Sequence, residues 1–456
     1  MEVIVKRIEA IYKFLYFSFF VLIILFGRSF TGIYIFGFRI GELMIAASLL
    51  VSIYFLIVVK RDNKFFYFGD KTFFLMKLIF ISFFITVFAT GGSLFYEYTY
   101  KSSSYIWTLA FLFYGMFAFN KINKDSNVLK IIPFLLPVTY ILSTTYFPQF
   151  LIDFFFKYSD KFDFLKASDV FLTFIFTNIF NRKYIKKEFN FYMYLLLSSA
   201  VFIPLFLFKS KGAFLPAIIF LFFEIIRTRN IFFKNKIKSL ILMGACVPIF
   251  FFSTYNAGLN LFVNDYTLEE EVLSTKIASS VSRAAKEKNT TELFGSFFIM
   301  DGRLYSEEQM ANWRLQIWQD VFWDLFYYSE YNNNDYNANL FRTELEPRRD
   351  VFLTGFGYNE ILDAMNDTSR RGTDLKNENV HNFALNILAK GGILQFLLFF
   401  AMYLSLIGYW YQKNKNFKLL GFITFSLMTA FFDVAMESVR FPFIFFGSIA
   451  YLFNEN

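Results

Sequence analysis

The chain has 456 residues, of which 56% are hydrophobic and 23% aromatic, whereas only 18% are charged. A water-soluble protein of this length could not cover so much apolar surface, because much of any folded surface faces water. The same numbers exclude a disordered chain and leave a multi-spanning membrane protein. With one Cys (Cys246) and one His (His381), the chain can form neither an internal disulfide framework nor a Cys/His metal site.

Twelve apolar runs approach the length of about 20 residues that a helix needs to cross the hydrocarbon core. We predict spans at 8–27, 40–59, 72–91, 104–119, 131–148, 168–180, 191–208, 212–226, 239–258, 387–411, 419–433 and 441–453. Basic residues follow each even-numbered span except the last, at 60–64, 120–130, 182–187, 227–238 and 413–418, and Lys6-Arg7 precede the first. The positive-inside rule then places these segments and both termini in the cytoplasm. The net charge of +8 therefore describes topology, and nucleic acid is not needed to explain it.

Residues 259–379 form a hydrophilic insert between the ninth and tenth spans. The insert carries 12 Lys/Arg and 21 Asp/Glu, a net charge of −9, so the rest of the chain carries +17. We divide the chain into spans 1–9 (1–258), an extracytoplasmic loop (259–380) and spans 10–12 (381–456). A long external loop is often functional. Helical periodicity predicts an amphipathic helix at 312–326, and the Asn-rich stretch 331–337 predicts a flexible surface turn.

The connection between the seventh and eighth spans places two lysines at the outer interface, against the positive-inside trend. Lys211 precedes Gly212 at a helix start, where an ammonium and free backbone N–H groups together would hold a phosphate. Snorkelling at the membrane surface is an equally good interpretation of Lys211 and the better one of Lys209. Ser210 completes this short segment.

Two further motifs lie in the external loop. Arg314 and Trp318 are four residues apart and share one face of the amphipathic helix. Periodicity alone favours a helix that packs on the membrane surface or on the loop's own core, with Arg314 solvated. Gly355 and Gly357 form a tight turn whose glycines permit positive φ or close backbone approach.

The most informative polar residue is His381, which lies where the loop re-enters the membrane. A helix N-terminus disfavours imidazolium, so a neutral imidazole that accepts a proton is expected there. The alternative is an interfacial or capping His without a chemical role. Between the last two spans lie Asp433, Glu437 and Arg440; the i, i+3 spacing of the last two favours a simple ion pair.

These residues resemble a known family. The segment Val380-His381-Asn382 through Gly391-Gly392, after a Gly-x-Gly turn, resembles the C-terminal signature of the O-antigen ligase and polymerase superfamily. Those proteins are bacterial membrane glycosyltransferases with the helical GT-C type of fold. Ser210-Lys211-Gly212 resembles the family's Ser-Arg-Gly motif, and Arg314-x-x-x-Trp318 resembles its Arg-x-x-x-Trp motif. The resemblance covers residues 190–453; Lys211 stands where the family often has Arg, which keeps the charge but loses bidentate geometry.

The resemblance implies an all-α membrane enzyme without metal or cofactor, in the bacterial cytoplasmic membrane with its active site outside. It would transfer a glycan from an undecaprenyl-diphosphate-linked donor. Arg314 and Lys211 would neutralise the leaving diphosphate, and His381 would deprotonate or orient the acceptor hydroxyl. We place further residues in substrate binding: Ser210, Gly212, Trp318, Gly355, Gly357, Asn382, Glu437 and Arg440. The implied partners are the lipid-linked oligosaccharide, an acceptor glycan or lipid A–core, membrane lipids and a chain-length regulator.

Several functions remain open at the level of sequence. A polymerase is favoured slightly over a ligase, because the Phe/Lys/Asn-rich composition suits AT-rich polysaccharide clusters; a related protein O-oligosaccharyltransferase is a third acceptor choice. A transporter or lipid-linked-sugar flippase is the main alternative of another class. Such proteins usually carry internal repeats and broken helices near the midplane, whereas the polar candidates here gather on the outer side. A receptor or scaffold built around the loop would leave His381 and Arg314 dispensable.

Overall fold

The structure, a computed structural model, describes residues 2–57, 68–119, 131–160, 162–185, 187–261, 297–300, 302–306, 309–326, 349–366, 370 and 378–454. The predicted basic segments at 60–64 and 120–130 and the Asn-rich turn at 331–337 lie essentially outside these residues. The N-terminal helices are α1 (Glu2–Thr31), α2 (Ile40–Ile57), α3 (Asp70–Ala89), α4 (Glu97–Ser102), α5 (Ser104–Trp107), α6 (Ala110–Phe119), α7 (Ile132–Thr144) and α8 (Gln149–Tyr158). They are followed by α9 (Ala167–Tyr184), α10 (Glu188–Lys209), α11 (Lys211–Lys234) and α12 (Lys236–Asn260).

The insert and the C-terminal part complete the element order. The insert contains α15 (Gln309–Phe326) and α16 (Arg349–Thr354), and the chain ends with α17 (Phe383–Asn414), α18 (Lys418–Ala430) and α19 (Arg440–Asn454). Two antiparallel hairpins are the sheets among the described residues: β1 (Tyr34–Ile35) with β2 (Phe38–Arg39), and β3 (Phe297–Met300) with β4 (Arg303–Ser306). A helix therefore occupies each predicted apolar run, and α15 occupies the predicted amphipathic segment.

Several of these helices are suited to a membrane. Within the described residues, five are long and apolar enough to cross one: α1 from Ala10, α3, α10, α12 and α17. The number becomes six if α7 and α8, which meet at an angle of 84°, are counted as one span. Many apolar side chains of α12 face outward; Phe251 and Phe252, for example, are 66% and 70% exposed. Apolar helices with exposed apolar faces indicate an all-helical membrane protein, because water would disfavour such a surface.

The centre of the bundle is formed by α9 and α19, whose side chains are buried on nearly all sides. This position is expected for α19, which is apolar nearly all round. Aromatic contacts hold α19 in place: the ring of Phe443 lies 5.0 Å from Tyr16 of α1 and 5.1 Å from Phe111 of α6. Phe176 of α9 makes an edge contact with Tyr451, 6.0 Å between ring centres. These contacts fix the last helix against the first half of the chain.

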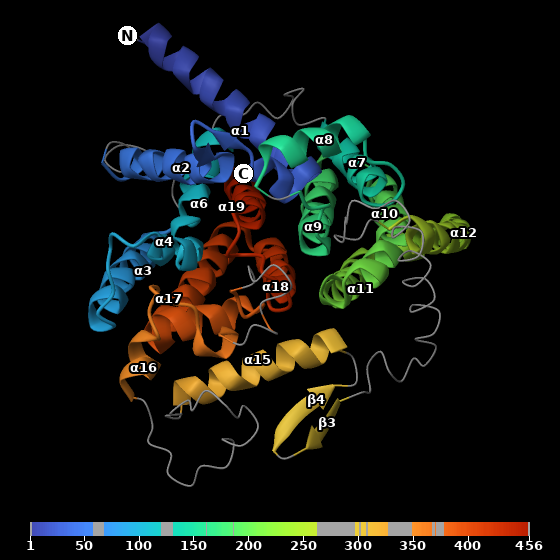
Figure 1. Cartoon of the computed structure of the whole chain (residues 1–456). Helices are drawn as coiled ribbons and strands as arrows, with labels where there is room; N and C mark the ends of the chain where they lie inside the picture. The colour runs from blue at the N-terminus through green and yellow to red at the C-terminus, as the bar shows by residue number, and fades with distance from the viewer. Residues whose placement is uncertain are drawn as a thin grey trace.

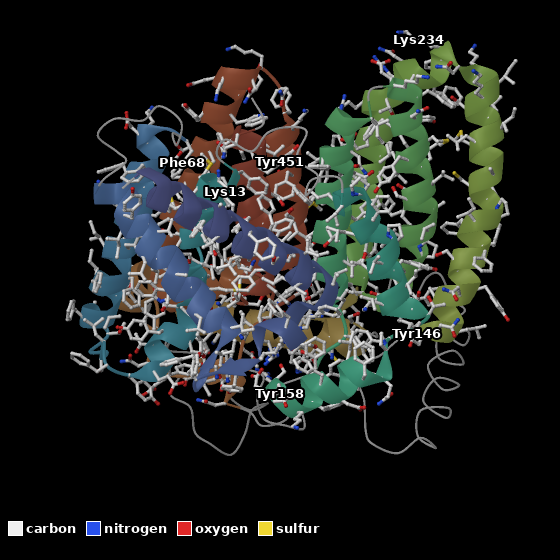
Figure 2. All side chains as sticks on the ribbon, turned by 90° about the horizontal axis from the view of Figure 1, so that it is seen from above. Lys13, Phe68, Tyr146, Tyr158, Lys234 and Tyr451 are labelled. Carbon is white, nitrogen blue, oxygen red and sulfur yellow. The ribbon has the colours of Figure 1, made fainter. Side chains whose placement is uncertain are left out.

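The bundle has two distinct ends. In Figure 2, α10, α11 and α12 run side by side, with Lys234 at one end and Tyr146 and Tyr158 near the other. We name these the Lys234 end and the loop end, because α8 and the described helix α15 of the insert lie at the latter. In Figure 1, α15 lies beside α17, with the β3–β4 hairpin next to it. The predicted basic loop at 227–238 is helical apart from a sharp turn at Asn235, so its lysines stand on helix ends.

Helix α8 is an element that the span pattern does not predict. The fifth predicted span, 131–148, ends as a helix at Thr144, and α8 begins immediately after Pro148. Proline lacks an N–H group and stands most easily at a helix start, which separates the two helices. In α8, Ile152 and Phe155 are buried, whereas Phe150 and Phe156 are exposed. This is the pattern of a helix that lies along the bundle end.

Candidate functional site

The segment that carries His381 is held by two tryptophans of α15. The indole N–H of Trp318 donates to the Val380 carbonyl at 2.7 Å, and the Trp313 ring stands edge-on to the His381 ring at 5.1 Å. The Asn382 side chain caps α17 by accepting from the Leu385 N–H at 3.0 Å. His381 itself has φ of +52°, a conformation that costs energy in a non-glycine residue and persists only where its surroundings impose it.

The predicted Gly-x-Gly turn completes a broken helix. Helix α17 is interrupted at Gly392, where φ is +70°, so the carbonyls one turn earlier lose their intrahelical partners. The N–H of Phe356 donates to Ala389 at 2.7 Å, and that of Gly357 donates to Lys390 at 3.1 Å, which replaces both bonds. A Cβ on Gly355 would lie 2.5 Å from the Lys390 carbonyl carbon. Gly355 and Gly357 thus fix the loop to α17 through the backbone.

Charged and polar side chains from five parts of the chain gather at the loop end. Asp433, between α18 and α19, accepts from the Ser168 hydroxyl at 2.7 Å and lies 3.8 Å from the Lys166 ammonium. It also acts electrostatically on His381, as Arg314 does. We call the following set the loop-end cluster: Lys166, Ser168, Asp169, Lys209, Arg314, His381, Asp433, Glu437 and Arg440.

The expected Glu437–Arg440 ion pair is not made. Arg440 instead places Nε 2.7 Å from a carboxylate oxygen of Asp169 in α9, and both side chains are 4% exposed. Glu437 accepts from the Ser104 hydroxyl through its backbone carbonyl at 2.8 Å, while its carboxyl lies beside Asn386. The i, i+3 spacing was a poor guide because Arg440 turns inward to a distant helix, which leaves the Glu437 carboxyl in the cluster.

The two lysines around Ser210 take opposite positions. The Lys211 side chain is exposed, whereas the Lys209 ammonium is buried and has no hydrogen-bond partner among the described residues. Asp169 acts electrostatically on Lys209, which places this ammonium in the loop-end cluster. A Cβ on Gly212 would lie 2.6 Å from the Phe432 side chain, so the turn packs directly against the segment that carries Asp433. Lys209 is therefore the lysine of this turn that points into the bundle, beside Asp169, whereas Lys211 points outward.

Burial and neighbouring charges set the protonation states. Burial lowers the pKa of His381 to about 3; Asp433 opposes this effect, and Arg314 and Lys166 add to it. Burial disfavours ionised Asp433, yet Lys166 and the Ser168 hydrogen bond hold its pKa below the usual range. Burial raises the pKa of Glu437 to about 8, and the Asp433 charge acts in the same direction. At neutral pH His381 is neutral, Asp433 is ionised and Glu437 is mostly protonated.

The described residues of the loop-end cluster carry an excess of positive charge. Arg440 and Asp169 form an ion pair, and Lys166 lies beside the ionised carboxylate of Asp433. Lys209 interacts electrostatically with Asp169, and Arg314 with His381. Counted over its own members, the set holds four cations and two ionised carboxylates in a partly desolvated setting, where electrostatic interactions are stronger than in water. Such a site suits a dianion. The described part of the chain contains no group of three His, Cys, Asp or Glu side chains arranged to hold a metal ion.

Sequence analysis selects His381 and Arg314, which the structure brings together. It assigns Lys209 to snorkelling and does not consider Lys166 or Asp169. Lys166 follows α8 at the loop end, so it too is a cation that opposes the positive-inside trend. Asp169 is a carboxylate one residue inside the predicted span 168–180. Both signals are visible in the sequence, since charged groups at such depth are costly unless paired or functional.

Comparison with known proteins finds no matching family model, no matching curated protein and no matching solved structure.

Proposed function

We propose that the chain crosses the bacterial cytoplasmic membrane twelve times in a GT-C-like arrangement, with both termini in the cytoplasm and the loop end outside. Three observations support this topology. A helix occupies each predicted run, the basic helix ends Lys234, Lys236 and Lys238 lie opposite α8, and the described helix α15 of the acidic insert lies at the loop end. Cytoplasmic enrichment of Lys and Arg is the strongest sequence determinant of orientation.

We further propose that the protein is a glycosyltransferase that uses an undecaprenyl-diphosphate-linked donor, acting as a surface-polysaccharide polymerase. The observation that carries the proposal is the loop-end cluster, where the cations Lys166 and Arg314 act on His381 and the buried ammonium of Lys209 has no hydrogen-bond partner among the described residues. A diphosphate diester bears two negative charges, one on each phosphate, so donor and site are electrostatically matched. Fixed cations would stabilise the charge that grows on the leaving diphosphate.

In this proposal the acceptor hydroxyl attacks the anomeric carbon and gives its proton to His381. An imidazole with a pKa of about 3 is a weak base. Arg314 and Lys166 are the cations that oppose protonation of His381. A bound diphosphate neutralises both of them and therefore increases the basicity of the imidazole. Proton transfer would thus be coupled to donor binding. Lys209 and Arg314 would hold the diphosphate, while Trp318 keeps its packing role.

The test supplies purified protein with a defined undecaprenyl-diphosphate repeat unit, with and without lipid A–core. A ladder without the core supports a polymerase, one product only with the core shows a ligase, and no product in either arm contradicts both. Arg314→Ala should abolish the product. Lys157→Ala removes an exposed cation on α8, outside the cluster, and should leave the yield unchanged.

A further inference from the structure

The Lys234 end holds a second cluster of charged side chains. The Glu224 carboxylate on α11 lies 3.0 Å from Arg227 of the same helix and 3.8 Å from Arg182 of α9. Lys418, the first residue of α18, acts electrostatically on the same carboxylate. We call Arg182, Glu224, Arg227 and Lys418 the inner cluster. Three cations around one carboxylate leave an excess of two positive charges.

Polar atoms of the inner cluster remain without hydrogen bonds in the described part of the chain. Glu224 is 8% exposed. Its Oε2 atom and the Nη1 atom of Arg182 are both buried, and the 3.8 Å between them is too long for a hydrogen bond. Buried polar groups normally find partners because burial without one is costly.

The surroundings of the inner cluster combine solvent access with an apolar flank. The side chains of Arg182 and Arg227 are 34% and 36% exposed, so the cluster is reachable from outside the bundle. On α11, Phe222, Phe223 and Ile226 are exposed within two residues of Glu224. A ligand with an anionic head and apolar chains would contact both regions at once.

We propose that the inner cluster binds the phosphate of an anionic glycerophospholipid from the cytoplasmic leaflet. Basic sites between helices on this side of a membrane attract anionic headgroups. The acyl chains would lie along the exposed apolar face of α11. The inference rests on the proposed topology and is independent of glycan transfer, since the two clusters lie at opposite ends of the bundle.

The test measures bound lipid by native mass spectrometry of the purified full chain in neutral detergent. Phosphatidylglycerol should bind in preference to phosphatidylcholine, and Arg182→Gln should weaken its binding about five-fold. The matched control, Lys236→Gln, removes an exposed cation at the same end and should change binding less than two-fold. Equal binding of the two lipids, or an equal loss in both variants, would overturn the inference. Inorganic phosphate that displaces phosphatidylglycerol at equal concentration would also overturn it, since the site would then take the free anion.

A second variant separates lipid binding from a structural ion-pair network. Glu224→Gln keeps the shape of the side chain and increases the net positive charge, so affinity for phosphatidylglycerol should stay equal or rise. A purely structural network predicts lower thermal stability in this variant with no difference between the two lipids, and that result would contradict the proposal. Arg182→Gln should retain glycan transfer, so failure here is distinguishable from failure of the proposed enzyme function.

Discussion

Because His381 is the only histidine in the chain, its imidazole can be observed alone. In protein labelled with ¹³C,¹⁵N-histidine and purified through a tag without histidine, NMR should show one imidazole. With a pKa of about 3, that imidazole stays neutral from pH 8 down to about pH 5, where an ordinary histidine would already be mostly protonated. The perturbation is a short-chain prenyl diphosphate, with the corresponding prenyl alcohol as the control.

The size of the expected effect follows from Coulomb's law. One unit charge about 8 Å away contributes about 2 kcal/mol at an effective dielectric constant of about 20, which changes a pKa by about 1.5. Two negative charges on a bound diphosphate should therefore raise the pKa of His381 from about 3 to about 6. The pKa of His381 should rise and not fall, because an anion stabilises imidazolium.

Two results would refute this reasoning. One is an imidazole that titrates near pH 6.5 before any ligand is added, which would mean that His381 is not desolvated. The other is a diphosphate that binds without changing the pKa of His381, which would mean that the anion binds away from this imidazole. Arg314→Gln provides an internal check, because removal of a cation that opposes imidazolium should raise the pKa of His381 in the unliganded protein.

The remaining predictions concern stability and donor binding. Gly355→Ala places a Cβ against the Lys390 carbonyl at positive φ and should lower the free energy of unfolding by at least about 2 kcal/mol, measured as a lower melting temperature. The control, Gly244→Ala, lies in open space within α12 and should be neutral or slightly stabilising. Arg440→Gln leaves the buried Asp169 carboxylate without its ion pair and should destabilise by about 3–5 kcal/mol; a melting temperature equal to wild type would contradict the pairing. Lys209→Met should weaken binding of a prenyl diphosphate at least about ten-fold without lowering the melting temperature, and unchanged affinity would remove Lys209 from the site.

The sequence predicted helices well because helix length and apolar composition are local properties. It could not predict the partner of Arg440, since Asp169 lies on another helix and local spacing pointed to Glu437. It favoured Lys211 over Lys209 because of the neighbouring Gly212, but which lysine turns inward depends on the extended conformation of Ser210, with φ of −166°. The pair Gly391-Gly392 indicates a break in α17. The N–H groups that bond the carbonyls left free at this break belong to Phe356 and Gly357, which come before α17 in the chain.

The repair of α17 also determines which parts of the protein would move together. The short helix from Phe383 to Gly391 is tied to the loop at its start, through Trp318 and Val380, and at its end, through Phe356 and Gly357. We therefore expect this short helix to move with the loop and not with the span that follows it. If the loop shifts, His381 travels with it, while Lys166 and Lys209 stay with the bundle. Under the proposed function, Arg314 and His381 would move with the loop while Lys209 stays with the bundle. The groups around the lipid diphosphate and the acceptor would then assemble fully only when the loop is packed against the bundle.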